Sequence, residues 1–354
     1  MGKNNDKWPG QVLIVRLSAL GDVAIAIPVI YSLCRAHEET QFVMLTQPWP
    51  ARAMIAPPPN LTVLGVDVKK QYKGLAGMWR LARKLHNQYH FDAIADLHSV
   101  LRSWTIDTFM RLHGVKVARI DKGRSEKKAL VSGLIHRPVK SSHDRYVDVF
   151  KQLGFDFKET FAGFERVQSH ILPSKQAGEH WIAVAPFSQH RGKEYPLPLL
   201  EQVVKELSRQ PENRIFLMGG GEQEKQALRP LAQKCDRTIS MAELKHDFGD
   251  EFALLSQCDV MVSMDSANMH LASLVNRPVV SIWGATHPYC GFMGWHQDMS
   301  NAVQLELPCR PCSVFGQKPC KLGDYRCLTG INPQDIVTKV NALLKNGVKG
   351  NLSS

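Results

Sequence analysis

The sequence VLIVRLSALGD at residues 12–22 decides the first half of the fold, and VMVSMDSANMH at residues 260–270 decides the second. In each segment an apolar run typical of a buried strand gives way to a polar turn and then to a helix-like pattern. Ligands of open α/β sheets bind at the carboxyl ends of the strands, where helix-start amides and polar side chains suit a phosphate group. Two such corners, far apart in the chain, therefore predict two domains that face one cleft.

The first half of the chain alternates apolar, strand-like runs with helical patterns. Strands are predicted at 11–16, 42–46, 61–66, 92–97 and 116–120. Helices are predicted at 22–36, 74–86, 100–113 and 144–153. This alternation predicts a parallel sheet with helices on both faces. The stretch 121–142 is basic and poorly periodic, so we expect a loop with one short helix there.

The second half repeats this alternation after a segment of little periodicity at 155–180, which we interpret as the linker. Its strands are predicted at 181–185, 214–218, 237–241, 259–264 and 278–283. A last helix over 333–346 is indicated by Asn332 as the cap residue and Pro333 at the first helical position. We therefore expect an N-terminal Rossmann-like domain at 1–165 and a C-terminal one at 166–354.

The size and composition of the chain agree with this division. Its 354 residues exceed what one hydrophobic core usually holds. No uncharged run approaches the ~20 apolar residues that a membrane span requires. Arg16 and Asp22 interrupt the first apolar run, which we interpret as a strand rather than a signal segment. We expect a cytoplasmic protein.

The net charge of +11 predicts an acidic partner. Nucleic acid, anionic lipid headgroups and a phosphorylated substrate all fit that charge, and a basic solvated surface would give the same total. The basic segment at 122–128 has no aromatic residue for base stacking, so nucleic acid is not expected.

The eight cysteines should be mostly reduced in a cytoplasmic chain. Four of them cluster late in the sequence, at Cys309, Cys312, Cys320 and Cys327. A CxxC pair followed by two more thiols could hold a structural zinc ion, although the second pair lacks the CxxC spacing. We expect loop thiols without a metal, and the zinc alternative stays open.

Two segments contain candidate catalytic or binding residues: the first corner and the loop that follows the first strand after the linker. Asp22 lies at a helix start, where an acid is favourable whatever the function, and its carboxylate could also accept a proton from a hydroxyl nucleophile. The loop 186–196 joins a buried strand to a helix and places Ser188, Arg191 and Lys193 above the sheet edge. A hydroxyl and a compact cation there suit a pyrophosphate, whereas a solvated loop is the structural alternative.

The second half offers two further candidates. Glu222 and Glu224 follow a triple-glycine turn, where an acid can bond a ribose hydroxyl or simply start a helix. The second corner combines a strand-ending acid, a small-residue helix start and a histidine one turn on, namely Asp265, Ser266, Ala267 and His270. Amides at that helix start would face an anion, whereas His270 alone could equally be a packed core residue.

Motifs of several other chemistries are missing from the sequence. No two Asp residues are separated by one residue, so the DxD element that holds a metal in many sugar transferases is lacking. HExxH and GxSxG are also lacking, which argues against metal hydrolysis and nucleophile-elbow chemistry. We expect no metal ion and no other cofactor.

Taken together, the segments 13–22 with Pro28, 259–272 and 277–288 resemble glycosyltransferase family nine, the heptosyltransferases of lipopolysaccharide core assembly. The similarity spans most of the chain. The resemblance implies a GT-B architecture, in which two Rossmann-like domains face an interdomain cleft and the final helix, here 333–346, often packs back on the first domain. It also implies an inverting, metal-independent transfer of a heptose from ADP-heptose.

The resemblance further implies roles for particular residues. Asp22 matches the proposed general base, and Lys193 matches the lysine that stabilises the departing nucleotide diphosphate. Glu222 matches the acid that binds the nucleoside, with Glu224 as its rival. The remaining donor-binding candidates are Ser188, Asp265, Ser266, Ala267 and His270. The family's usual Thr-Gly after the donor-site Asp is Ser266-Ala267 here, and a frequent Trp is Tyr195, which bears on the donor more than on the reaction.

An acidic, lipid-linked acceptor of the Kdo–lipid A type would need basic residues on the first domain. The candidates are His98, Arg102, Lys122, Arg124, His143 and Arg145. We therefore expect peripheral contact with the inner face of the cytoplasmic membrane. The alternatives are a transferase of the same fold that uses another nucleotide sugar, and a protein that binds a nucleotide sugar without turnover.

Overall fold

The computed structural model describes residues 9–165 and 168–350, with side chains described as far as Lys345. The chain forms two compact units. The first comprises the chain up to Lys122 together with Lys140–Ala162, and the second comprises Gly123–Val139 and the chain from Gly163 onward. Residues 166–167, at the expected domain boundary, lie outside the described residues. The segment Gly123–Val139, which the sequence analysis placed in the first domain, belongs to the second unit.

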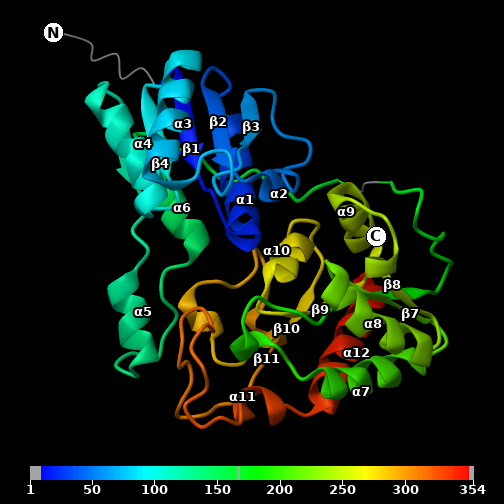
Figure 1. Ribbon diagram of the computed structural model, residues 1–354. Coiled ribbons are helices and arrows are strands. Elements are labelled where there is room, and N and C mark those ends of the chain that lie inside the picture. Colours follow the sequence, from blue (N-terminus) through cyan, green and yellow to red (C-terminus); the bar gives the residue numbers. More distant parts are fainter. Residues whose placement is uncertain (1–8, 166–167, 351–354) are drawn as a thin grey trace. The chain divides into compact units, whose positions relative to one another are not determined.

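The first unit is built on a parallel sheet in the order β3-β2-β1-β4-β5 (Figure 1). Its strands are β1 (Gln11–Val15), β2 (Gln41–Thr46), β3 (Leu61–Gly65), β4 (Ala93–Asp96) and β5 (Lys116–Arg119). The apolar run in β1 forms the centre of this unit, because Val12 to Val15 are fully buried. The strand order reverses at β1, so a topological switch point lies where β1 and β4 end.

Helices connect these strands close to the predicted positions. They are α1 (Leu20–Ala36), α2 (Pro48–Ala51), α3 (Gly74–Gln88), α4 (Leu101–Leu112) and α6 (Ser142–Gln152). α1 packs against α6, and α3 packs against α4. Because α1 follows β1 and α4 follows β4, both helices begin at the switch point.

The second unit contains another parallel sheet, in the order β11-β10-β9-β6-β7-β8. Its strands are β6 (His180–Ala185), β7 (Asn213–Leu217), β8 (Thr238–Ser240), β9 (Val260–Met264), β10 (Val279–Ile282) and β11 (Ala302–Val303). Here the order reverses between β6 and β9, which places a second switch point at their carboxyl ends. The predicted α/β class with two Rossmann-like parallel sheets is confirmed.

The second unit contains the remaining helices of the described residues. They are α5 (Arg124–Val131), α7 (Leu197–Ser208), α8 (Glu222–Lys234), α9 (Phe248–Gln257), α10 (Ala267–Ser273), α11 (Arg326–Thr329) and α12 (Pro333–Gly350). The closing helix α12 packs against α7, β9 and β10. Its apolar residues Ile336, Val340 and Leu344 are buried in the core of the second unit.

The excursion at Gly123–Val139 contains α5, the short helix expected in the basic stretch. Three contacts join this segment to the later part of the second unit. The Val139 N–H donates to the Tyr289 carbonyl at 3.0 Å, and Leu130 packs in a small cluster with Cys290. The Lys127 ammonium lies 4.1 Å from the ring centroid of Phe292, which is a cation–π contact.

Within the described part of the chain, no helix is both long enough and apolar enough to cross a bilayer.

Candidate active site

The first switch point holds Asp22 in the first turn of α1. Its Oδ2 accepts the Ala19 N–H at 3.1 Å, so the carboxylate satisfies the free amide of the N-cap residue at the helix start. The same oxygen pairs with the Arg16 guanidinium. The Asp22 side chain is nevertheless 28% exposed, so the carboxylate is held in place yet can reach a ligand from solvent.

Arg16, directly after β1, orients this carboxylate. Its guanidinium is buried, and Nη1 donates to the carbonyl of Leu97, directly after β4, at 2.7 Å. The side chain thus bridges the two strands that flank the switch point. Burial opposes its charge, but Asp22 and Tyr146 raise the pKa of Arg16 overall. Arg16 is a functional residue that was not predicted; its position as a cation directly after a buried strand is the sequence signal that could have identified it.

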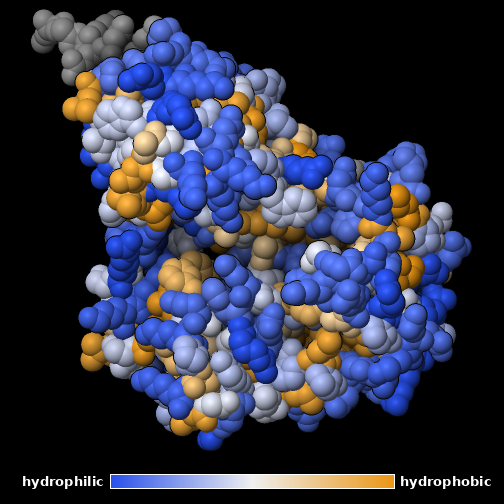
Figure 2. Space-filling model, in the orientation of Figure 1, coloured by the Kyte–Doolittle hydropathy of each residue, from blue (hydrophilic) through white to orange (hydrophobic). Residues whose placement is uncertain are grey.

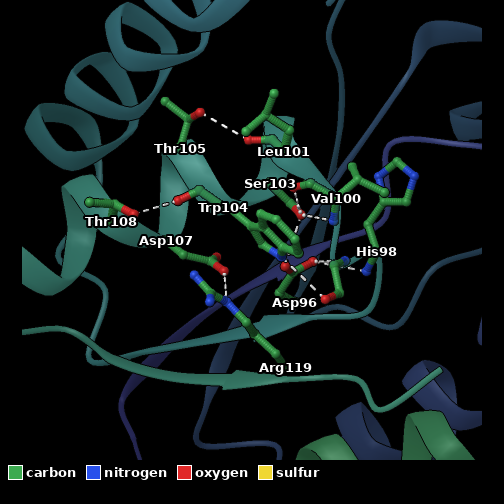
Figure 3. A network of polar contacts seen from close by, with 11 residues as sticks. Asp96, His98, Val100, Leu101, Ser103, Trp104, Thr105, Asp107, Thr108 and Arg119 are labelled. Carbon is green, nitrogen blue, oxygen red and sulfur yellow. Dashed lines mark hydrogen bonds and ion pairs between the residues drawn. The ribbon is translucent and has the colours of Figure 1, made fainter. Parts of the chain in front are cut away.

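The other side of the switch point is a network anchored by the buried Asp96 at the end of β4 (Figure 3). Its Oδ1 accepts the N–H groups of His98 and Ser99, each at 2.8 Å. Its Oδ2 accepts the Ser103 hydroxyl at 2.8 Å, and that hydroxyl oxygen in turn accepts the Val100 N–H at 3.0 Å. The network fixes the turn from β4 into α4 and therefore the position of His98.

His98 is buried and uncharged. Burial, followed by the nearby charges of Arg16, Lys122 and Arg102, lowers the pKa of the imidazole to about 3. Among the described residues, its Nδ1 has no hydrogen-bond partner. A buried polar atom without a partner in a native fold usually has a ligand or water to bind. Because the charges of Lys122, Asp22 and Arg102 all act on the His98 imidazole, the fold brings His98, Arg102 and Lys122 together near Asp22.

The structure does not group the other three acceptor candidates with them. Arg124 lies on α5 of the second unit, which corrects its placement on the first domain. His143 lies on α6, and its Nε2 pairs with Glu159, which follows that helix, at 2.5 Å. Arg145 is buried, and its guanidinium donates to the carbonyls of Lys140 and Asp121, each at 3.2 Å. His143 and Arg145 thus make local contacts around the start of α6.

The second switch point holds a buried ion pair. The Lys193 Nζ lies 2.8 Å from Asp265 Oδ2, and the Thr286 hydroxyl donates to the same oxygen at 2.8 Å. Lys193 ends the short turn Arg191–Lys193 in the loop after β6, and Asp265 follows β9. The Asp265 side chain is 3% exposed and that of Lys193 is 14% exposed, so the ammonium is the member that a ligand can reach.

Close backbone packing fixes the Lys193 side chain. The Gly192 carbonyl accepts the Ala285 N–H at 2.8 Å, and a Cβ atom at Gly192 would lie only 2.8 Å from the Gly316 carbonyl oxygen. A Cβ atom at Gly316 would lie 2.7 Å from Lys193 Cγ. Glycine is therefore required at both positions. Ser188 closes the other end of this loop, because its N–H donates to Glu194 Oε1 at 3.1 Å.

The two rival acids after the triple glycine have different surroundings. Glu224 Oε2 folds back to accept the Gly220 N–H at 2.7 Å, and burial followed by the charge of Glu194 raises its pKa against that hydrogen bond. Glu222 is exposed at the first position of α8, where its carboxylate accepts only a long hydrogen bond, 3.2 Å from Gln226 Nε2, among the contacts described. The geometry therefore favours Glu222 for a ligand and Glu224 for closing the turn.

The rest of the second corner lies on α10. Ser266 is the cap residue of this helix, and its Oγ lies 3.3 Å from Ser263 Oγ rather than on a helix-start amide. Ala267 begins the helix, and His270 is buried one turn on. These residues adjoin Asp265 and the second switch point.

The cysteine-rich loop supports this site through its backbone. The Cys312 N–H donates to the Ala285 carbonyl at 3.1 Å, and Arg310 Nη2 donates to the Thr286 carbonyl at 2.8 Å. The four late cysteines are free thiols. Across residues 9–165 and 168–350, no group of three or more His, Cys, Asp or Glu side chains is placed to hold a metal ion.

Two Rossmann-like units, one with an oriented carboxylate and one with an oriented ammonium at its switch point, are an arrangement that fits the class of glycosyltransferases. The family model for glycosyltransferase family 9 (heptosyltransferase) matches residues 78–324. The chain therefore belongs to glycosyltransferase family 9, as its motifs predicted, and it is an enzyme.

Named relatives agree with this assignment. Lipopolysaccharide heptosyltransferase 1 of Pseudomonas aeruginosa is 23% identical over 361 residues, which cover 94% of this chain and 98% of the relative. Lipooligosaccharide heptosyltransferase 2 of Campylobacter jejuni is 22% identical over 340 residues, with 92% and 96% covered. These relatives support a heptosyltransferase role in lipopolysaccharide biosynthesis.

Solved structures show the same fold. A glycosyl transferase family 9 protein from Veillonella parvula superposes with a TM-score of 0.74 at 18% identity, covering 95% of this chain and 98% of the other. The E. coli heptosyltransferase WaaC with ADP superposes with a TM-score of 0.65 at 18% identity, covering 94% and 99%. The predicted GT-B fold class is confirmed.

Proposed function

We propose that this enzyme transfers a heptose from ADP-heptose to an inner-core lipopolysaccharide acceptor of the Kdo–lipid A type, with inversion and without a metal ion. The observation that carries the proposal is the Asp22 carboxylate, which Arg16 holds at a switch point while 28% of the side chain stays exposed. A base in that position suits a reaction whose nucleophile is a sugar hydroxyl.

In the proposed reaction, the acceptor hydroxyl attacks the anomeric carbon of the heptose from the side opposite the diphosphate. Asp22 takes the hydroxyl proton as the new C–O bond forms. The bond between the anomeric carbon and the diphosphate oxygen breaks, and its electron pair leaves with ADP. Because a single displacement reverses the configuration at that carbon, this route is inverting.

Lys193 would stabilise the negative charge that develops on the departing ADP. The buried Asp265 fixes its ammonium 2.8 Å away, so the cation is already oriented when the bond breaks. An ammonium group in this role performs what a divalent cation does in metal-dependent transferases. Glu222 would bind the ribose of the donor. Ser188 and the start of α10, with His270, would line the donor site.

The acceptor would meet His98, Arg102 and Lys122 beside Asp22. The two cations suit the carboxylates and phosphates of a Kdo–lipid A acceptor. The neutral His98 imidazole has Nδ1 available for a sugar hydroxyl. The acceptor is lipid-linked, so the enzyme would work on the inner face of the cytoplasmic membrane.

The test is incubation of the purified enzyme with ADP-heptose and Kdo–lipid A, with and without EDTA. We expect ADP release, a heptosylated product whose anomeric configuration is opposite to that of the donor, and no effect of EDTA. Absence of ADP release with any such acceptor would contradict the proposal, and loss of activity in EDTA would contradict its metal-free mechanism. A thermal-shift panel of nucleotide sugars separates the alternatives: a stronger shift with another donor, or a shift without turnover, would favour them.

A further inference from the structure

α3 and α4, which pack side by side in the first unit, expose large apolar side chains. These are Leu75 and Trp79 on α3 and Leu101, Trp104 and Leu112 on α4. Leu112 is 71% exposed and Leu101 60%, whereas each tryptophan exposes more than a third of its surface. Single exposed leucines are ordinary, but several on two neighbouring helices mark an interaction surface.

The same two helices are strongly basic. Between Asp67 and Asp92 the sequence contains six Lys and Arg residues and no acidic residue. The exposed basic side chains of the two helices are Arg80, Arg83, Lys84, Arg102 and Arg111. The acid within α4, Asp107, is buried and paired with Arg119 at 2.5 Å, so it does not offset this charge at the surface. We call these basic residues and the five apolar ones the α3–α4 surface.

Contacts within the first unit fix the two tryptophan rings of the α3–α4 surface. Trp79 meets Phe109 edge-on, with ring centroids 5.0 Å apart, and Trp104 Nε1 donates to Ser99 Oγ at 3.2 Å. Figure 2 shows hydrophobic residues over α4 beside strongly hydrophilic ones. Because α4 begins a few residues after His98, the α3–α4 surface borders the first switch point.

We propose that the α3–α4 surface docks the enzyme on an anionic lipid bilayer. Tryptophan rings lie at the headgroup level of a membrane, leucines enter the boundary of the acyl chains, and Lys and Arg bind anionic headgroups. A nucleic acid would use the cations and the rings but would leave the exposed leucines without a role. The inference rests on the proposed function, and it names the surface that brings the enzyme to a lipid-linked acceptor.

The first experiment measures sedimentation of the full chain with vesicles. Wild-type protein should bind vesicles of equal parts phosphatidylglycerol and phosphatidylcholine, bind pure phosphatidylcholine weakly, and dissociate as salt is added. The triple variant R80E/R83E/K84E should lower partitioning into the mixed vesicles at least about 50-fold, because each basic residue near an anionic surface strengthens binding by about 1 kcal/mol, or roughly fivefold. Trp79→Ala should lower it about tenfold.

The matched control places the same charge change elsewhere. The variant K225E/R229E/K234E reverses three basic residues on α8 of the second unit and should lower partitioning no more than about threefold, because screening limits long-range charge effects. Equal losses in the two triple variants would show that net charge alone governs binding and would overturn the proposal. Thermal unfolding verifies that each variant is folded.

The second experiment separates docking from chemistry. With Kdo–lipid A in mixed vesicles, R80E/R83E/K84E should lose at least about tenfold in rate; with a de-acylated, water-soluble acceptor it should match wild type. If the wild-type enzyme turns over no acceptor yet binds anionic vesicles through this surface, the proposed function fails and the docking inference stands. Failure to prefer anionic vesicles overturns the inference. So does tighter binding to a single-stranded oligonucleotide that the same triple variant abolishes.

Discussion

The two switch points of this enzyme use the same device with opposite charge. In the first unit, the buried Arg16 guanidinium holds the partly exposed Asp22 carboxylate. In the second, the buried Asp265 carboxylate holds the more exposed Lys193 ammonium. The Lys193–Asp265 pair joins the segments that follow β6 and β9, whereas Arg16 and Asp22 both follow β1 and Arg16 reaches the end of β4 through the Leu97 carbonyl.

The difference between the pairs shows how one fold, used twice, can supply two chemical roles. A buried partner fixes the geometry, and the sign of the exposed partner decides what it can do. An exposed carboxylate can take a proton, whereas an exposed ammonium can stabilise a leaving diphosphate. Breaking each pair in turn therefore tests whether the roles are distinct.

Asp22→Asn should have the largest effect, because it keeps the shape of the side chain and removes the proton acceptor. We expect kcat to fall by about 10²–10⁴-fold, with ADP binding unchanged. The control is Asp250→Asn, since the Asp250 carboxylate accepts its own helix-cap N–H at 3.1 Å, as that of Asp22 does. Steady-state kinetics and titration with ADP are the measurements. A comparable rate loss in Asp250→Asn, or a mild one in Asp22→Asn, would mean that Asp22 is only a helix cap.

Lys193→Met should come next. We expect kcat to fall by about 10²–10³-fold, because the charge on the leaving group is no longer stabilised. The free energy of unfolding should fall by about 2–3 kcal/mol, because Asp265 stays buried without its cation. The double variant K193M/D265N removes the orphaned charge and should recover stability but not activity. Recovery of both in chemical denaturation and rate measurements would show that Lys193 serves structure alone.

The two holding residues should differ in which kinetic constant they affect. Arg16→Met leaves Asp22 unoriented, so kcat should fall about 10–100-fold while KM for the donor stays close to wild type. Asp265→Asn loosens Lys193 and should raise KM for the donor about tenfold. Arg277→Met, which removes another guanidinium bonded to backbone carbonyls, controls for a general loss of stability. If Arg16→Met and Asp265→Asn changed kcat and the donor KM in the same way, the two ion pairs would not have distinct roles.

The smallest expected difference is in pH dependence. The pKa of His98 in the folded state is about 3, below its ordinary 6.5, so the unfolded chain takes up a proton that the folded chain does not. The free energy of unfolding should therefore fall as pH drops below 6.5, by about 1–2 kcal/mol at about pH 5. His246 in the second unit behaves oppositely, because its bond to Glu251 raises its pKa to about 9 and favours the charged form. Its stabilisation is present below pH 6.5 and is lost as pH rises through 9.

Denaturant unfolding of His98→Gln and His246→Gln across this pH range checks both signs. We expect His98→Gln to reduce the loss of stability in acid and His246→Gln to reduce the loss in alkali, the latter by at most about 1 kcal/mol. Curves parallel to those of wild type would show that neither imidazole titrates as its surroundings indicate.

Much of the fold could be predicted because buried strands need continuous apolar runs. The strand expected at 181–185 is His180–Ala185, and the helix expected at 74–86 is Gly74–Gln88. The corner motifs also pointed to Asp22, Lys193 and Asp265, since each follows such a strand. Local pattern is sufficient there, because a strand and the turn after it are neighbours in sequence.

Contacts between distant segments could not be predicted in this way. The segment Gly123–Val139 belongs to the second unit because of a hydrogen bond to Tyr289 and packing around Cys290. Glu222 and Glu224 have similar sequence neighbours, and only the fold of the glycine turn separates them. Arg145 is basic in composition, yet its guanidinium is bonded to carbonyls of Lys140 and Asp121.

By itself, the sequence determined two parallel α/β sheets and the polar residues that end their central strands, because hydrophobic periodicity and turn chemistry act over a few residues. Only the tertiary structure decided which of those residues are paired, buried or exposed. Arg16 became the partner of Asp22 because β1 and β4 lie side by side and the Leu97 carbonyl fixes the guanidinium between them. Whether a charged group is held or left open therefore depends on contacts such as Arg16 with Leu97 and Lys193 with Asp265, whose members come from distant parts of the chain.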